Sequence, residues 1–481
     1  ARLADEVVVM DAPRLPIALN CLRTPAREHG FEPLRASYGA APEALNGTLY
    51  RVGPGRFEDA AGPYGHWFDG EGLLTAIRFR GGEVSAACRM IVPAGAERED
   101  YASRGRLGRA PRGLARRVIG YVRPDVYVNV ANTALMEWQG RLFALFEAGL
   151  PTEVDRETLE TLGETDLGVV RRSLGAHPQP RAETGELINQ GFSPAPFARV
   201  DYYALPEKGA PRRLARAAVS DRFPAHDLAV AGAHAVTVMS PLFVDIPRLL
   251  GGAPVSRCLR WRPERGTEVV VAPLNGGAAW RASAPAMLYS HTAHAFEEDG
   301  VLVVQGVAAA DASLADWTAR VRRGCKSLAP SPSPGRLTEI RIDLETRRVS
   351  VEALFEAPLE FPAVDPRRPG ARAGVVYAAG WGDDRDAYSD FYDAVLRFDL
   401  TEDAPRRFEF GHGHAVSEPV FVPGGEAEGE GWLLCVNYDA HADRSCVMVL
   451  EAGVEMKLVA TLPLPQPLPM SLHGLWSEAE G

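Results

Sequence analysis

The chain has 481 residues, of which 46% are hydrophobic, and its formal net charge is -11 at pH 7. The hydrophobic fraction is that of an ordinary globular protein and is ample for a large core. The acidic balance argues against a nucleic-acid partner, because binding to phosphates favours a basic surface.

Short runs rich in β-forming residues, each bounded by turn residues, recur along the whole chain. In chain order they are 47–53, 73–92, 133–149, 197–205, 228–240, 261–273, 337–357, 395–400, 418–423, 432–439 and 446–462. Gly81-Gly82 and Gln139-Gly140 divide two of the longer runs as hairpin turns would. This spacing predicts an all-β fold of the propeller, barrel or sandwich kind.

Domain number and blade number are harder to predict than the fold class. Length alone suggests about three domains of ~150 residues each. The strand runs continue without a change in composition, so we expect a single domain, residues 1–481. The chain has no strict repeat of the WD or kelch type, and blades therefore cannot be counted from self-similarity.

Two segments interrupt the strand pattern. Residues 106–122 combine five arginines with leucine, valine and isoleucine, as a short interfacial helix would, and residues 241–252 are apolar with two prolines. Both are either surface elements packed on the core or a basic and apolar patch that contacts a membrane peripherally. The N-terminal residues lack the pattern of a signal peptide, no apolar run reaches the ~18 residues of a spanning helix, and the six cysteines form no CxxC pair. We expect a cytoplasmic protein. If the basic and apolar patch contacts a membrane, the protein would be associated with that membrane.

The segment SHTAHAFEEDG, residues 290–300, contains two histidines and two glutamates that could bind a metal. Asp299-Gly300 is a strong hairpin signal, and VLVVQGV after it is typical of a returning strand. The zinc motif HExxH requires a helix, so this strand pair does not fit it. His291 and His294 therefore need partners from elsewhere in the chain.

Four histidines occur in similar contexts, each near a strand end and followed by a small or turn-forming residue. They are His177, His226, His291 and His473. They lie far apart in sequence, and a propeller is a fold that brings many strand ends to one axis.

Six segments with distinctive composition follow one another along the chain. They are NGTLYRVGPG (46–55), HWFDGEGLL (66–74), LFALFEAGLPTEVDRETLETLG (142–163), HTAHAFEEDG (291–300), SEPVFVP (417–423) and LHGLW (472–476). In these segments and in their order, the chain resembles the carotenoid cleavage oxygenase family over nearly its whole length. The resemblance implies a propeller of about seven blades, with a few helices and loops that cap an axial iron site.

The resemblance also implies the residues of that site. Fe(II) would be held by His177, His226, His291 and His473, which are then the catalytic residues, and Glu147, Glu360 and Glu418 would support three of the imidazoles. Four neutral imidazoles suit Fe(II) and leave two octahedral positions open, although zinc or copper competes on raw affinity. His177 would be supported by water or backbone. His294 stands where the family usually has Asn, and we interpret it as a strand residue near the site.

The family inserts O2 into a carbon–carbon double bond, so the expected partners are a lipophilic polyene and O2. Candidate pocket residues are Thr133, Phe146, Phe223 and Phe361, for which ordinary core packing is the alternative interpretation. Stilbene-cleaving members usually have Lys where this chain has Phe146, which favours a carotenoid or apocarotenoid substrate. The alternatives are a stilbene-cleaving dioxygenase, an isomerase on the same fold, and a propeller that binds a polyene without cleaving it.

Overall fold

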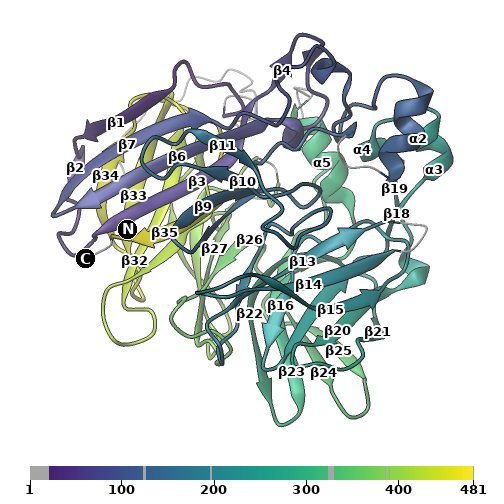
Figure 1. The fold of residues 1–481 in the computed structure, drawn as a ribbon. Helices are drawn as coiled ribbons and strands as arrows, with labels where there is room; N and C mark the ends of the chain where they lie inside the picture. Colours follow the sequence, from purple (N-terminus) through teal and green to yellow (C-terminus); the bar gives the residue numbers. More distant parts are fainter. Residues whose placement is uncertain are drawn as a thin grey trace.

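The computed structural model describes residues 21–122, 126–194, 198–322, 330–384, 386–388 and 390–479. These residues form a seven-bladed β-propeller (Figure 1), which confirms the predicted all-β fold and the propeller of about seven blades that the family resemblance implied. We number the seven sheets that have four or more strands as blades one to seven, in their order around the ring.

The first three blades contain the following strands, given from one edge of each sheet to the other. Blade one is β1 (His29–Leu34), β7 (Glu83–Met90), β6 (Glu71–Arg80), β3 (Gly47–Arg56) and β35 (His473–Glu478). Blade two is β11 (Thr161–Glu164), β10 (Thr152–Val154), β9 (Arg141–Leu145) and β8 (Ala134–Trp138). Blade three is β12 (Gln179–Pro180), β13 (Leu187–Ser193), β14 (Arg199–Leu205) and β15 (Arg212–Ala218).

The other four blades follow the same antiparallel pattern. Blade four is β16 (Ala229–Ala231), β17 (His234–Met239), β20 (Thr267–Pro273) and β21 (Trp280–Ala284). Blade five is β22 (Leu288–Glu298), β23 (Val301–Ala309), β24 (Arg336–Asp343) and β25 (Val349–Ala353). Blade six is β26 (Leu359–Ala363), β27 (Val375–Gly380), β28 (Ala394–Asp399) and β29 (Arg406–Glu409). Blade seven is β2 (Tyr38–Gly39), β34 (Leu458–Pro463), β33 (Arg444–Glu451), β32 (Gly431–Asp439) and β30 (His414–Val416), with β31 (Val420–Pro423) also paired to β32.

Some middle strands, such as β20, are apolar on both faces because each blade is packed between two others. In β20, Val269 and Val271 join a core cluster with Leu302 of blade five, whereas Val270 joins a cluster with Tyr202 of blade three. Successive side chains of a strand point to opposite faces, so one strand contributes to two cores. This explains why β20 has a continuous apolar run and not an alternating one.

The ring is closed by strands from the two ends of the chain. β35 pairs with β3 in blade one, with Val52 opposite His473, and β2 pairs with β34 in blade seven. The pairing with β3 therefore places the start of the C-terminal strand on the inner side of blade one. This closure brings residues that are more than 400 positions apart in sequence into one sheet.

The hairpin predicted around Asp299-Gly300 is present as β22 and β23. Both turn residues have positive φ, 50° at Asp299 and 76° at Gly300, as a tight two-residue turn requires. The register of the pair shifts between Tyr289 and Thr292 and again between Thr292 and His294. These irregularities surround His291 and break the simple alternation of the strand.

Short helices lie outside the blades. They are η1 (Trp67–Asp69), η2 (Tyr101–Ser103), α2 (Leu114–Val122), α3 (Ile246–Leu250), α4 (Val255–Cys258), η4 (Pro263–Arg265) and α5 (Ser313–Arg322). α2 contacts α3, which contacts α4, and the three lie together at the upper right of Figure 1. Only the second half of the predicted 106–122 helix is helical, and 241–252 forms the short strand β18 (Leu242–Val244) followed by α3. Among the described residues, no helix is long and apolar enough to cross a bilayer.

Candidate metal centre

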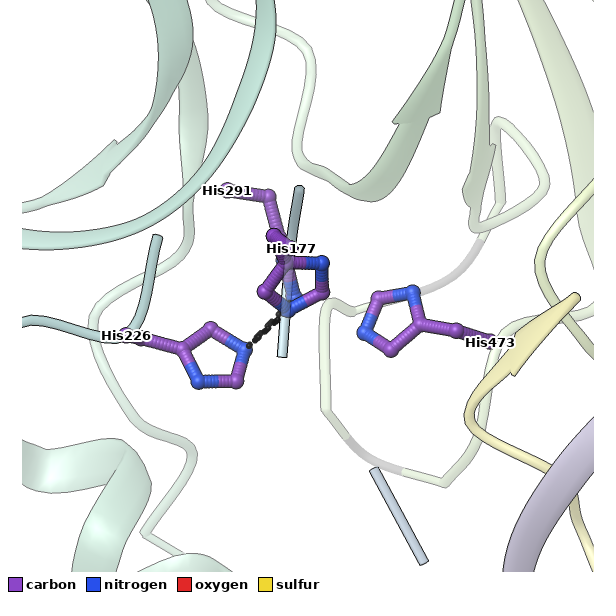
Figure 2. A group of neighbouring side chains, drawn as sticks. All are labelled: His177, His226, His291 and His473. Atoms are coloured by element: carbon purple, nitrogen blue, oxygen red, sulfur yellow. Dashed lines mark hydrogen bonds between the residues drawn. The ribbon is translucent and has the colours of Figure 1, made fainter. Parts of the chain in front are cut away.

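Four imidazole rings converge on one point inside the ring of blades (Figure 2). One nitrogen from each of His177, His226, His291 and His473 lies within 4.8 Å of the corresponding nitrogens of the others. The Nε2 atom of His226 is 3.1 Å from the Nε2 atoms of both His177 and His291. The ring of His473 faces the same space, with its centroid 4.5 Å from that of His177.

The four histidines come from four different blades. His177 and His226 lie in the loops that lead into the innermost strands β12 and β16, His291 lies on β22, and His473 is the first residue of β35. Three glutamates complete the ring: Glu147 follows β9, Glu360 lies on β26, and Glu418 lies between β30 and β31. Each of the seven blades therefore supplies one of these seven residues.

Each glutamate accepts a hydrogen bond from the Nδ1 atom of one histidine. Glu147 contacts His226. The distance from Nδ1 to the carboxylate is 2.7 Å between His291 and Glu360, and 2.8 Å between His473 and Glu418. An ionised carboxylate only accepts, so the Nδ1 atom that it binds carries the proton, and the lone pair of Nε2 is then free to bind a metal.

The second oxygen of each carboxylate is also held. The Gly474 backbone N–H donates to Glu418 at 2.6 Å, the Ser290 hydroxyl donates to Glu360 at 2.9 Å, and the Thr133 hydroxyl donates to Glu147 at 3.4 Å. The carboxylates are therefore restrained from both sides, and so are the ring orientations of the histidines that they bind. The hydrogen bond from Ser290 is a role that its position before His291 did not reveal.

His177 differs from the other three histidines, because no described carboxylate contacts its Nδ1 atom. Burial and the neighbouring imidazoles of His473, His226 and His291 hold the pKa of His177 well below its usual range. Burial and neighbouring imidazoles lower the pKa of His473 in the same way. Burial acts to lower the pKa of His226, but the charge and hydrogen bond of Glu147 together with the charges of Asp227 and Glu360 raise it.

The donor set fits a divalent transition metal. Neutral imidazoles at this spacing can each donate a lone pair, whereas four protonated rings would repel one another. Iron, copper, nickel and zinc all accept imidazole nitrogen, and the Nδ1 hydrogen bonds to carboxylates are those that metal-binding histidines commonly make. The geometry therefore fits the iron that the sequence motifs implied, without selecting it over other metals of this class.

Two of the four predicted pocket residues lie beside the centre. Thr133 is buried and donates to Glu147, and the buried ring of Phe361 lies 5.3 Å from the ring of His291 and 5.1 Å from that of His473. Phe361 also has a positive φ of 55°, which directs its side chain differently from a regular strand residue. Phe146 and Phe223 are half-buried, and neither makes a described ring contact with the four histidines.

The remaining polar residues of the hairpin motif lie outside the centre. The Nε2 atom of His294 accepts a hydrogen bond from the Ala373 backbone N–H at 3.1 Å. Glu298 pairs with Arg372 at 2.7 Å, and a Glu297 carboxylate oxygen is 3.5 Å from the Nδ1 atom of His234. The motif therefore contributes His291 alone to the four converging rings.

Asp227 is a buried residue of this region that no sequence motif predicted. Its carboxylate accepts hydrogen bonds from the backbone N–H groups of Thr292, at 2.7 Å, and Leu228, at 2.6 Å. The contact with Thr292 ties the loop that carries His226 to the strand that carries His291. Its place directly after His226 was the only available signal, and that signal does not distinguish a structural acid from a solvated one.

We expect His294 to make the unfolding free energy depend on pH. Burial lowers the pKa of this ring from 6.5 to about 4, so the unfolded chain binds more protons than the folded protein between these values. The stability contributed by the neutral ring is complete above the unfolded pKa and falls as the pH decreases, by about 2 kcal/mol between pH 7 and pH 5. Urea unfolding at both pH values measures this loss, which should be smaller by about that amount in His294→Asn. Equal losses in the two proteins would contradict the assignment.

Comparisons with known proteins agree with this fold and centre. The family model described as retinal pigment epithelial membrane protein matches residues 23–478. The apocarotenoid-15,15'-oxygenase of Synechocystis sp. is 30% identical over 461 residues, which cover 92% of each chain. The chloroplastic carotenoid cleavage dioxygenase 7 of Oryza sativa subsp. japonica is also 30% identical, over 93% of this chain and 88% of that protein.

A solved structure shows the same architecture. The crystal structure of cobalt-substituted Synechocystis ACO has a TM-score of 0.84 to this protein and is 26% identical in sequence, and the match covers 97% of this chain and 99% of that chain. The family match extends over nearly all of the described residues and includes all seven blades. The chain therefore belongs to the retinal pigment epithelial membrane protein family, the family of carotenoid cleavage oxygenases that its six motifs indicated.

Proposed function

We propose that this protein is an Fe(II)-dependent oxygenase that cleaves a carbon–carbon double bond of a carotenoid or apocarotenoid. The observation that carries the proposal is the convergence of four imidazoles, three of them bound by carboxylates. A protein that only binds a polyene has no need of this arrangement. The proposal includes a single propeller domain over residues 1–481, which the pairing of β35 with β3 supports.

The reaction takes one alkene and one O2 to two carbonyl products. Both oxygen atoms are incorporated, the carbon–carbon double bond and the O–O bond are broken, and no proton or external reductant is needed. When bound, Fe(II) supplies electron density to O2 and so overcomes its slow reaction with an alkene. His177, His226, His291 and His473 would hold the iron as neutral nitrogen donors, so that the metal keeps its full positive charge.

The other residues position the site and exclude water. Glu147, Glu360 and Glu418 retain the Nδ1 protons of their histidines and so keep each Nε2 atom directed at the metal. Phe361 covers two of the histidines with an apolar ring. The hydroxyl of Thr133 donates to Glu147. The methyl group of Thr133 is then free to limit the space beside the metal site.

Replacement of a proposed ligand should abolish metal binding and product formation together. We expect this of His226→Ala and His473→Ala, whereas Glu418→Gln should reduce metal affinity or activity by roughly 10–100-fold, because it only supports a ligand. Metal content by elemental analysis and aldehyde formation by chromatography measure the two effects. His294→Asn is the matched control and should keep both. Retained turnover in either purified alanine variant would refute that ligand assignment.

Apocarotenals or carotenoids should be cleaved faster than phenolic stilbenes. Phe146 has no group that can pair with a phenolic oxygen, and the residue is half-buried directly before Glu147. The test is a panel of apocarotenals, carotenoids and stilbenes with Fe(II)-loaded protein in detergent, read as product masses. Faster cleavage of a stilbene would favour the stilbene-type alternative. A product with an unchanged carbon number would favour an isomerase, and binding without any product would favour a binding protein.

We further propose that the protein binds membranes peripherally through α2 and the adjacent residues 241–252. Three apolar side chains of α2 project into solvent: Leu114, Val118 and Ile119 are 62%, 51% and 43% exposed. They lie at spacings that place them on one side of a helix, and α3 packs beside it. Of the five arginines in 106–122, Arg106 is buried against Glu71 and Arg109 pairs with Asp59, so any basic contribution to this face comes from Arg112, Arg116 and Arg117.

A charge on this face should weaken binding to vesicles. We expect Val118→Asp to lower the fraction of protein that floats with vesicles of mixed zwitterionic and anionic phospholipids, because an ionised side chain resists transfer from water. Leu162→Asp is the control, since Leu162 is equally apolar and 60% exposed but lies on β11, away from α2. Equal flotation of wild type and Val118→Asp, or an equal loss in both variants, would contradict a membrane role for α2.

A further inference from the structure

Arg51 is a fully buried cation at the point where the propeller closes. It lies on β3, is 1% exposed, and sits in register with Gly474 of β35 on one side and Thr75 of β6 on the other. Arg51 is next to Val52, and Val52 pairs with His473 across the two strands. In the sequence, Arg51 is distinguished only by its place in the segment NGTLYRVGPG.

The three groups that the guanidinium binds are all neutral. Nε donates to the Ser471 hydroxyl at 2.7 Å, Nη1 donates to the Glu418 carbonyl at 2.9 Å, and Nη2 donates to the Leu472 carbonyl at 3.2 Å. Among the described residues, no carboxylate lies within ion-pair distance of Arg51. Removing a cation from water costs several kcal/mol when no carboxylate pairs with it directly, and the charge of Glu418 offsets part of this cost from a greater distance.

The groups that accept hydrogen bonds from Arg51 are connected through the main chain to His473 and to the glutamate that supports it. Ser471 and Leu472 are the residues directly before His473, and Glu418 is the residue whose carboxylate binds the Nδ1 atom of His473. One side chain from blade one therefore joins the C-terminal segment to blade seven. A neutral side chain of similar length could fill the same space, but it could not donate to three acceptors in different directions.

We propose that Arg51 is a positioning residue of the metal centre, which clasps the backbone of Glu418 and of Leu472 and so holds His473 against its supporting carboxylate. The inference rests on the proposed function, because it takes His473 as a metal ligand. Arg51 itself does not touch the metal or the substrate. Its effect passes through the main chain at two places, and loss of the clasp frees His473 and Glu418 to move relative to each other.

The test uses metal binding and not turnover. Wild type, Arg51→Met and Arg51→Lys are loaded with Co(II), and the visible d–d spectrum and the rate of metal loss to an excess of chelator are recorded. We expect Arg51→Met to change the spectrum and to lose metal ~10-fold faster, as loss of an outer contact of a ligand does at other metal sites. Arg51→Lys should lie between the two, because lysine keeps the charge but not the planar set of donors.

Arg397→Met is the matched control for the loss of a buried arginine. Arg397 is 8% exposed and lies on β28 of blade six, where it contacts Asp399. A purely structural role for Arg51 predicts that both methionine variants unfold at lower temperature while both keep the wild-type spectrum and rate of metal loss. That result would overturn the inference, whereas a change confined to the Arg51 variants supports it.

A milder variant keeps the test decisive if Arg51→Met does not fold. Ser471→Ala removes the acceptor of Nε alone and leaves the cation in place. We expect it to increase the rate of metal loss by a smaller factor than Arg51→Lys, and a rate equal to that of wild type would count against the clasp. Wild-type protein that binds neither Fe(II) nor Co(II) would refute the proposed function itself, and equal behaviour of all variants would refute only the role of Arg51.

Discussion

The pairing of β35 with β3 is the interaction on which the centre depends. It closes the ring with a strand from the far end of the chain, and the first residue of that strand is His473. Without this pairing, three histidines from blades three, four and five would face a gap. The same closure brings Glu418 of blade seven within hydrogen-bond distance of His473. The completeness of the centre therefore depends on one set of backbone hydrogen bonds, those between β35 and β3.

The arrangement of one group from each blade has a physical reason. A propeller directs the innermost strand of every blade at a common axis, so seven short segments can each place one side chain there. Four of these side chains are nitrogen donors, and three are acceptors that control the protonation of those donors. The irregular register around His291 and the positive φ of Phe361 show that the inner strands depart from regular geometry where they meet the axis.

Burial has a cost at this centre, and the surrounding contacts offset it. Burial raises the pKa of the Glu418 carboxyl to about 7, and the charge of Arg51 acts in the opposite direction. Buried charges need partners or hydrogen bonds, and the Gly474 N–H and the His473 ring provide them for Glu418. The apolar face of Phe361 lies against the same histidines. Rigid polar contacts and an apolar surface thus meet at the position where a lipophilic substrate is proposed to react.

The sequence by itself determined the class of fold, the hairpin at Asp299-Gly300 and, through its motifs, the family. These follow from local patterns: turn residues, strand-forming runs and signatures that are continuous in the chain. His291 and His294 are three residues apart, so a regular strand turns them to opposite faces, but the local sequence does not say which face meets the axis, and only the family resemblance indicated His291. In the structure the His291 ring lies with the other three rings at the axis, and the His294 ring lies against the Ala373 backbone. Only the tertiary structure revealed the contacts of Asp227 and of Arg51, because Asp227 meets a strand of the next blade and Arg51 meets segments that come together only when the ring closes.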